Sequence, residues 1–176
     1  MLDGFEEIEG LTVVDILRRA GIDISMISIN GKKKVTGAHG IALDTDEDIV
    51  QCDPDKLDML VLPGGMPGTT NLAACEKLTE ALKKADQEKR GIAAICAAPS
   101  VLGDLGFLKG KKAVCYPGFE SRLTGAEVLA VPVVTDGHIT TSRGMGTAIA
   151  FALELTKRLK DEETAKQVGR SILYNV

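Results

Sequence analysis

Hydrophobic and polar residues follow two different periods along this chain. Residues 8–20 place apolar side chains every three or four positions, which predicts a helix. Residues 22–29 alternate apolar and polar side chains, which predicts a strand, and Asn30-Gly31 marks the turn after it. The run 57–62 is short, mostly apolar and followed by Pro63-Gly64-Gly65, as expected for a buried parallel strand.

The same patterns assign the rest of the chain. They predict a short hairpin or edge strands at 35–43, strands at 91–95, 112–115, 127–134 and 139–142, and helices at 71–89, 97–105, 146–159 and 161–172. Strands therefore alternate with helices, which favours an α/β domain with a mostly parallel sheet between helical layers. No repeat, low-complexity tract or linker interrupts the pattern, so residues 1–176 are interpreted as a single domain.

The beginning of the sequence departs from the usual order. A doubly wound domain usually opens with a strand near the middle of its sheet, whereas this sequence enters a helix after a few residues. The predicted sheet thus lacks its usual first strand: either the sequence is truncated or another segment fills that position. Loss of a central strand exposes two unpaired backbone edges.

Composition restricts the partners and the compartment. The net charge is −4 and no basic block stands out, which argues against nucleic-acid binding. No apolar run approaches the roughly 20 residues of a membrane span, and the acidic start does not resemble a signal peptide. The four cysteines form no C-x-x-C pair and no Cys/His ligand spacing, which predicts a reducing cytoplasmic location and no metal site or cofactor.

Cys96 is the strongest candidate for chemistry. It follows the predicted strand 91–95, precedes a helix, and is flanked by small residues (Ala93, Ala94, Ala97 and Ala98), as a nucleophile elbow requires. A cysteine at a helix N-terminus also feels the positive end of the helix dipole, which favours the thiolate. The alternative is a buried, inert cysteine. Of the other cysteines, Cys115 alone ends a strand and could face the same sheet edge.

Two further segments could support this thiol. The glycine-rich turn after residue 62 is either a plain turn or an oxyanion hole built from backbone N–H groups. Glu6, Glu7 and Glu9 either provide favourable charge at a helix N-terminus or place a carboxyl group beside the thiol. A carboxyl group in that position would be driven toward its protonated form. Neither His39 nor His138 lies near Cys96 in the sequence, so no Cys–His dyad is predicted.

Four motifs in this order resemble the ThiJ/PfpI superfamily, in the branch of the Parkinson-disease-associated protein deglycase and bacterial YajL-like proteins. They are Asp3-Gly-Phe-Glu-Glu-Ile-Glu9, Asp58-Met-Leu-Val-Leu-Pro-Gly-Gly65, Ala93-Ala-Ile-Cys-Ala-Ala-Pro99 and Thr141-Ser-Arg-Gly-Met-Gly-Thr147. The resemblance implies a flavodoxin-like three-layer sandwich, typically a homodimer. It also implies Cys96 as the nucleophile, Glu9 as a protonated partner of the thiol, and the Gly65 and Ala97 amides as oxyanion donors.

The resemblance implies a cysteine-dependent glyoxalase or protein deglycase acting on methylglyoxal, other small α-oxoaldehydes, or glycated thiols and amines. The alternative is an oxidation-sensing thiol protein or redox-regulated chaperone with little turnover. Many relatives carry a histidine where this sequence has Tyr116. Tyrosine is a poorer base at neutral pH. Tyr116 is thus at most an auxiliary acid, and the substitution argues against a protease-type dyad.

Overall fold

The computed structural model describes residues 1–174. Its helices are α1 (Glu7–Arg19), α2 (Gly68–Ala74), α3 (Glu76–Glu88), α4 (Pro99–Asp104), α5 (Ala148–Leu159) and α6 (Glu162–Ser171). Its strands are β1 (Ile27–Ser28), β2 (Lys34–Thr36), β3 (Ala42–Asp44), β4 (Glu47–Asp48), β5 (Met59–Leu62), β6 (Gly91–Ile95), β7 (Lys112–Ala113), β8 (Glu127–Val128), β9 (Val133–Asp136) and β10 (Ile139–Ser142). Short 3-10 helices lie at Pro54–Lys56, Glu120–Arg122 and Met145–Thr147.

The main sheet has the strand order β5-β6-β10-β9. In this sheet the pairs β5–β6 and β6–β10 are parallel, and the β9–β10 hairpin is antiparallel. The remaining strands form the two-stranded pairs β1–β4, β2–β3 and β7–β8. The sequence-based prediction of an α/β domain with a mostly parallel sheet is therefore confirmed.

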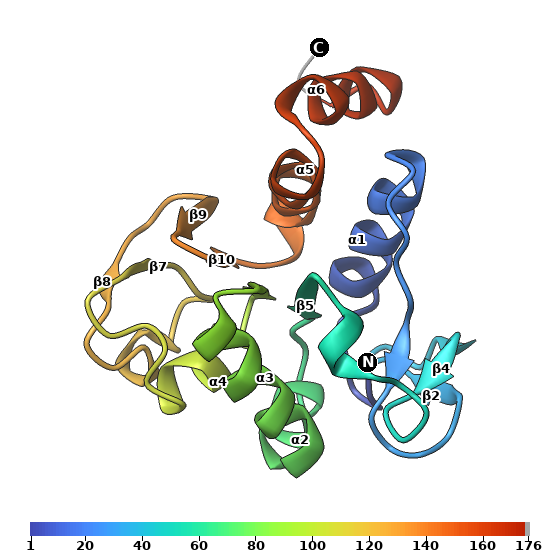
Figure 1. Cartoon of the computed structure of the whole chain (residues 1–176), viewed down its shortest axis with the longest axis vertical. Coiled ribbons are helices and arrows are strands. Elements are labelled where there is room, and N and C mark those ends of the chain that lie inside the picture. The colour runs from blue at the N-terminus through green and yellow to red at the C-terminus, as the bar shows by residue number, and fades with distance from the viewer. Residues whose placement is uncertain (175–176) are drawn as a thin grey trace.

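Strand β6 shows how the sheet separates two hydrophobic cores. Its residues Ile92 and Ala94 pack with α2, α3 and α4 on one face, whereas Ala93 and Ile95 pack with α1 and α5 on the other. Strand residues alternate between faces, so a strand that is buried on both faces must be apolar throughout. Helices thus cover both faces of the sheet, and α6 packs on α5 at the outside (Figure 1).

Three sequence-based predictions need correction. The strand predicted over 22–29 is reduced to β1, because residues 22–26 lie next to an open position of the sheet. The helix predicted over 71–89 is divided at Cys75, whose backbone is extended (φ −82°, ψ 104°). The strand predicted over 127–134 is divided into β8 and β9 at Pro132, which has no N–H group for a ladder.

No strand precedes α1 within residues 1–174, as the sequence led us to expect. None of the helices in this part of the chain combines the length and the apolar character that a membrane crossing requires.

Candidate active site

Cys96 lies at the turn between β6 and α4 in a left-handed backbone conformation (φ 65°). Such a conformation is uncommon for a residue other than glycine and persists only where the surroundings hold it. Here the Cys96 N–H donates to the Ser142 carbonyl at 3.0 Å, and the Cys96 carbonyl accepts from the Tyr116 N–H at 2.8 Å. The backbone is therefore held from two neighbouring segments, and the turn has the geometry of a nucleophile elbow.

Glu9 approaches the thiol from α1. Its side chain is almost completely buried, with 1% exposure, and Oε2 accepts a hydrogen bond from the Gly64 N–H at 2.9 Å. Its carboxyl group lies close enough to the Cys96 thiol for each group to shift the pKa of the other. The first helix, the loop after β5 and the end of β6 thus meet at one carboxyl–thiol pair.

Gly64 leaves the space in which this pair sits. A Cβ atom built at Gly64 would lie 2.6 Å from the Cys96 Cβ and 2.6 Å from Glu9 Oε2. The adjacent Gly65 has a φ of 91°, which favours glycine, and its N–H group and that of Ala97 act to lower the pKa of the Cys96 thiol. The glycine pair therefore has two separate roles: close approach at Gly64 and a special backbone conformation at Gly65.

Replacement of Gly64 by alanine is expected to destabilise the fold by about 1–3 kcal/mol, because the new methyl group overlaps both acids of the pair. Urea denaturation measures this change. Gly169→Ala is the matched control: Gly169 lies inside α6, where an added Cβ meets only Leu153 at an ordinary 3.5 Å, so this change is expected to stabilise slightly. Equal stability of the Gly64→Ala variant and the wild type would contradict the packing argument.

The carboxyl–thiol pair shifts the pKa of both of its members upward. Burial raises the pKa of Glu9 to about 7, against hydrogen bonds from Cys96 and Gly64 that lower it. Burial, the Glu9 charge and the Glu9 hydrogen bond raise the pKa of the Cys96 thiol to about 12. The expected net lowering of the thiol pKa is therefore wrong, although the Gly65 and Ala97 N–H groups at this turn do act to lower it. Helix α4 is short (Pro99–Asp104), and its dipole has less effect on the thiol pKa than burial beside the Glu9 carboxyl group.

Two coupled acids of this kind titrate as one unit. Below a pH of about 7 the pair holds two protons, and above it the pair shares one proton and one negative charge. The shared proton can reside on the Glu9 oxygen, which leaves a Cys96 thiolate next to a hydrogen-bond donor. The pair can therefore supply a nucleophile and a proton donor from the same ionisation state.

A cavity of about 620 Å³ opens over the Cys96 thiol. Tyr116 lies on its wall with 51% of its side chain exposed, and Gly144 gives it room because a Cβ there would lie 3.2 Å from the tyrosine ring. The cavity lining includes all five residues that the sequence singled out: Glu9, Gly65, Cys96, Ala97 and Tyr116. Cys115 instead packs in the core beneath, and burial raises its pKa to about 11.

Sequence reasoning missed two basic residues of the cavity wall. His39 comes from the β2–β3 hairpin, and its Nδ1 lies 2.9 Å from Glu7 Oε2, while the Glu7 hydrogen bond raises its pKa. Arg143 comes from the loop after β10, and within the described residues its side chain has neither a hydrogen bond nor an ion pair. Only the tertiary structure brings His39 next to α1, so the sequence held no signal for it. Arg143 lies within the motif Thr141–Thr147, which the sequence had already singled out.

Glu6, Glu7 and His39 offer ligand atoms that lie within 4.8 Å of one another, a spacing that a metal ion can bridge. The hydrogen bonds of Glu7 account for this cluster without one. Burial acts to raise the pKa of Glu7, but bonds from the His39 side chain and from backbone N–H groups lower it to about 2. The carboxylate of Glu7 therefore already has its partners.

Comparison with known proteins places the chain among DJ-1/PfpI relatives. Residues 1–158 match the DJ-1/PfpI family. Protein dj-1beta of Drosophila melanogaster is 36% identical over 176 residues, which cover 98% of this chain and 94% of that protein. A deglycase of Pyrococcus abyssi is 32% identical over 160 residues, 90% of this chain and 95% of that protein. The chain spans less than half the length of two Arabidopsis thaliana DJ-1 homologues, 38% of homolog B and 44% of homolog A.

Solved structures agree with this assignment. The structure of oxidised Toxoplasma gondii DJ-1 superposes with a TM-score of 0.95 at 35% identity, and covers 99% of this chain and 96% of that one. The crystal structure of Drosophila melanogaster DJ-1beta also gives a TM-score of 0.95, at 34% identity, with 100% of this chain and 96% of that one covered.

Proposed function

Because the chain belongs to the DJ-1/PfpI family, we propose that it is a cysteine-dependent glyoxalase or deglycase, acting on methylglyoxal or its adducts. The observation that carries the proposal is the buried Glu9–Cys96 pair beneath an open cavity. A deglycase name among the relatives of similar length supports the same class of reaction.

In the first step the Cys96 thiolate attacks the aldehyde carbon of methylglyoxal. The S–C bond forms, and the carbonyl oxygen takes up the electron pair and then a proton, which gives a hemithioacetal. The Gly65 and Ala97 N–H groups favour negative charge on the sulfur, and both residues line the cavity, so they are the donors expected for a developing oxyanion next to it. Glu9, as the protonated member of the pair, supplies the proton.

In the second step Glu9, now ionised, removes the proton from the former aldehyde carbon, and the neighbouring carbonyl oxygen takes up a proton from water, which gives an enediol. Glu9 then returns its proton to the neighbouring carbon, and the hydroxyl group on the former aldehyde carbon loses its proton to water as the thioester carbonyl forms. This isomerisation converts the hemithioacetal into a thioester of lactate without an external oxidant, because one carbon is oxidised as the other is reduced. Water then cleaves the thioester, which releases lactate and restores the thiol. Tyr116 serves as an auxiliary hydrogen-bond donor, and Arg143 offers a charge partner for the product carboxylate.

The test is the conversion of methylglyoxal to lactate by the purified protein, followed by NMR and by chiral analysis of the product. A single lactate enantiomer is expected, because a chiral active site delivers the proton to one face of the carbon. The uncatalysed reaction is not stereoselective and gives racemic lactate. The value of kcat/KM is expected to rise with pH through about 7, where the pair loses its first proton, and then to level off. Racemic lactate formed at the rate of the protein-free solution would refute the enzymatic proposal.

A second function, an oxidation-sensing thiol or redox-regulated chaperone, draws on the same pair. Glu9 and the two backbone N–H groups provide hydrogen bonds that suit the oxygens of a sulfinic acid on Cys96. Mass spectrometry after mild peroxide treatment is expected to find two added oxygens at Cys96 and unmodified Cys52, Cys75 and Cys115. Oxidation spread over all four cysteines would argue against a sensor.

We also propose that the protein is a homodimer. Ile8 and Leu11 of α1 and Ile41 of the adjacent hairpin keep 50%, 38% and 56% of their side chains exposed. The His39 N–H of this hairpin donates to Glu7 Oε1 at 2.8 Å, so the hairpin lies against the start of α1. Exposed apolar side chains on neighbouring elements favour a protein contact, and sedimentation of the purified protein tests it.

A further inference from the structure

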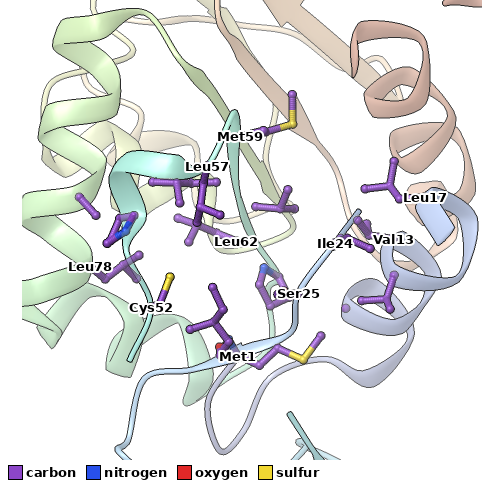
Figure 2. Close-up of a pocket in the computed structure, with 18 of the residues that line it drawn as sticks. Met1, Val13, Leu17, Ile24, Ser25, Cys52, Leu57, Met59, Leu62 and Leu78 are labelled. Carbon is purple, nitrogen blue, oxygen red and sulfur yellow. The ribbon is translucent and has the colours of Figure 1, made fainter. Parts of the chain in front are cut away.

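A second cavity differs from the one over Cys96 in the ligands that it can bind. Figure 2 shows this second cavity, of about 320 Å³, whose walls are mainly apolar and include Val13, Leu57 and Leu78. Walls of this kind offer few groups that could hold a charged ligand. The cavity over Cys96 is different, because its lining includes four ionisable side chains besides the thiol and Tyr116: Glu6, Glu9, His39 and Arg143.

Three of these four side chains have partners within the protein. His39 Nδ1 lies 3.6 Å from Glu6 Oε2, and Glu9 Oε2 accepts from the Gly64 N–H at 2.9 Å. The side chain of Arg143 has no hydrogen bond or ion pair within residues 1–174, although the residue is partly buried. A guanidinium group keeps its charge and presents five N–H donors. A partly buried guanidinium group without a counter-ion therefore favours an anionic ligand in the cavity.

The charge of Arg143 acts on the interior of the site. Burial and the Glu120 charge raise the pKa of the Cys115 thiol, whereas the Arg143 charge lowers it. Cys115 is buried, and the next residue, Tyr116, donates its N–H to the Cys96 carbonyl at 2.8 Å. Because exposed charges are strongly screened by water and salt, this influence places the guanidinium group toward the Cys96 turn rather than out in solvent.

The backbone around Arg143 is fixed by its hydrogen bonds. The Arg143 N–H donates to the Pro132 carbonyl at 3.2 Å, and the Gly144 N–H donates to Thr147 Oγ1 at 3.1 Å. Thr147 Oγ1 in turn lies 2.7 Å from the hydroxyl oxygen of Ser142, which is completely buried. A side chain that extends from a fixed backbone loses less conformational entropy when it binds a ligand.

Tyr116 adds a second polar group to the same wall. Its ring packs against Gly144, the residue after Arg143, where a Cβ atom would lie 3.2 Å from the ring. Tyr116 is half exposed, and its hydroxyl group has no hydrogen-bond partner among the described residues. A phenol hydroxyl group both donates and accepts hydrogen bonds. The wall thus combines a cation, which suits a carboxylate, with a neighbouring hydroxyl group, which suits an oxygen on the adjacent carbon.

We propose that Arg143 and Tyr116 form a binding site for small 2-hydroxy and 2-oxo carboxylates in the cavity over Cys96. The carboxylate pairs with the guanidinium group, which can donate two parallel N–H bonds to it, and the oxygen at position 2 bonds with the Tyr116 hydroxyl group. Lactate belongs to this class, so the product and other acids of the class compete with methylglyoxal. This competition rests on the proposed function, whereas binding itself requires neither turnover nor the Cys96 thiol.

The probe is racemic lactate, with lactamide as its uncharged analogue and propionate as its analogue without the hydroxyl group. NMR titration of the isotope-labelled protein, followed at the Arg143 Nε–H signal, is expected to give saturable binding of lactate with a Kd of about 0.1–10 mM. Lactamide is expected to bind at least about tenfold more weakly, because it has no charge to pair with the guanidinium group. Propionate is expected to bind about 2–10-fold more weakly, because it lacks one neutral hydrogen bond.

Three protein variants locate the site. Arg143→Gln keeps a polar side chain without the charge and is expected to weaken lactate binding at least about tenfold, as followed at the amides of 144–147. Arg170→Gln is the matched control, because Arg170 lies in α6 and pairs with Glu163 there, and it is expected to leave the Kd unchanged. Tyr116→Phe is expected to abolish the difference between lactate and propionate. Circular dichroism checks that each variant is folded.

Equal Kd values of lactate and lactamide for the wild type, or of lactate for the wild type and Arg143→Gln, would overturn the proposal. No saturation by lactate up to about 100 mM would do the same. A Tyr116→Phe variant that still prefers lactate to propionate would overturn the part assigned to Tyr116.

One variant separates this proposal from the proposed function. Cys96→Ala has no thiol and is expected to bind lactate as the wild type does, although it cannot form lactate. Lactate binding by a wild-type protein that does not convert methylglyoxal would count against the enzymatic proposal alone. Conversion of methylglyoxal without any binding of lactate would count against the carboxylate site alone.

Discussion

Replacing Cys96 by alanine is expected to lower the rate of lactate formation from methylglyoxal by at least about a thousandfold, to the rate of the protein-free solution. The variant has no group that can form the hemithioacetal, and its neighbours cannot replace it. Cys115 packs in the core, and burial raises its pKa to about 11. The fold is expected to persist, because the strained turn is held by backbone bonds to Ser142 and from Tyr116 rather than by the thiol.

Cys115→Ala and Cys52→Ala are the matched controls for this loss. Each removes one thiol of the same chain at a buried position outside the cavity over Cys96. Both are expected to keep at least about half of the wild-type kcat/KM once their folded fraction is taken into account. A Cys96→Ala variant that retained comparable turnover would rule out covalent catalysis by this residue.

Replacing Glu9 by glutamine is expected to lower kcat by about 10²–10⁴-fold while it makes the protein more stable at pH 8. Glutamine keeps an oxygen for the Gly64 N–H but cannot take up or release a proton. The thiol itself is expected to become easier to ionise, because the charge and the hydrogen bond of Glu9 both raise its pKa in the wild type. Iodoacetamide should therefore modify Cys96 of the variant faster at pH 8.

The gain in stability follows from the sign of the pKa shift. The folded protein holds the Glu9 proton up to a pH of about 7, whereas the unfolded chain releases it near 4.5. Stability therefore falls as the pH rises from 4.5 to 7, and the full cost above this range is roughly 3 kcal/mol. Urea denaturation of the two proteins should differ by about this amount at pH 8 and agree below pH 4. Slower alkylation together with lower stability of the variant would contradict the assignment of Glu9.

The cost of Glu9 to stability supports the proposed catalytic role of this residue. A buried carboxyl group whose pKa lies near 7 works against folding at neutral pH, and its hydrogen bonds to Gly64 and Cys96 only partly offset the burial. Its neighbour Glu7 is also buried, but several donors lower its pKa to about 2, so its charge is well tolerated. Two glutamates in the first turn of α1 thus carry pKa shifts of opposite direction, set by the donors around each carboxyl group.

Local pattern was sufficient for most of the secondary structure. The apolar runs of β5 and β6 and the helical stripe of α1 depend on residues close to one another in the chain, so periodicity identifies them. The secondary-structure prediction failed where pairing with another strand decides whether a segment forms a strand. Residues 22–25 alternate as a strand does, yet they join no strand ladder, because no strand within residues 1–174 lies beside them.

By itself the sequence determined the α/β class, the turn that presents Cys96 and, through resemblance, the residues expected around it. Tertiary structure decided which groups meet there: Glu9 reaches the Gly64 N–H across 55 positions, and His39 reaches Glu7 across 32. It also reversed the expected pKa shift of the thiol, because burial and a facing carboxyl group outweigh a short helix dipole. Turn geometry is a local property, whereas the electrostatic environment of Cys96 is the sum of segments that only folding brings together.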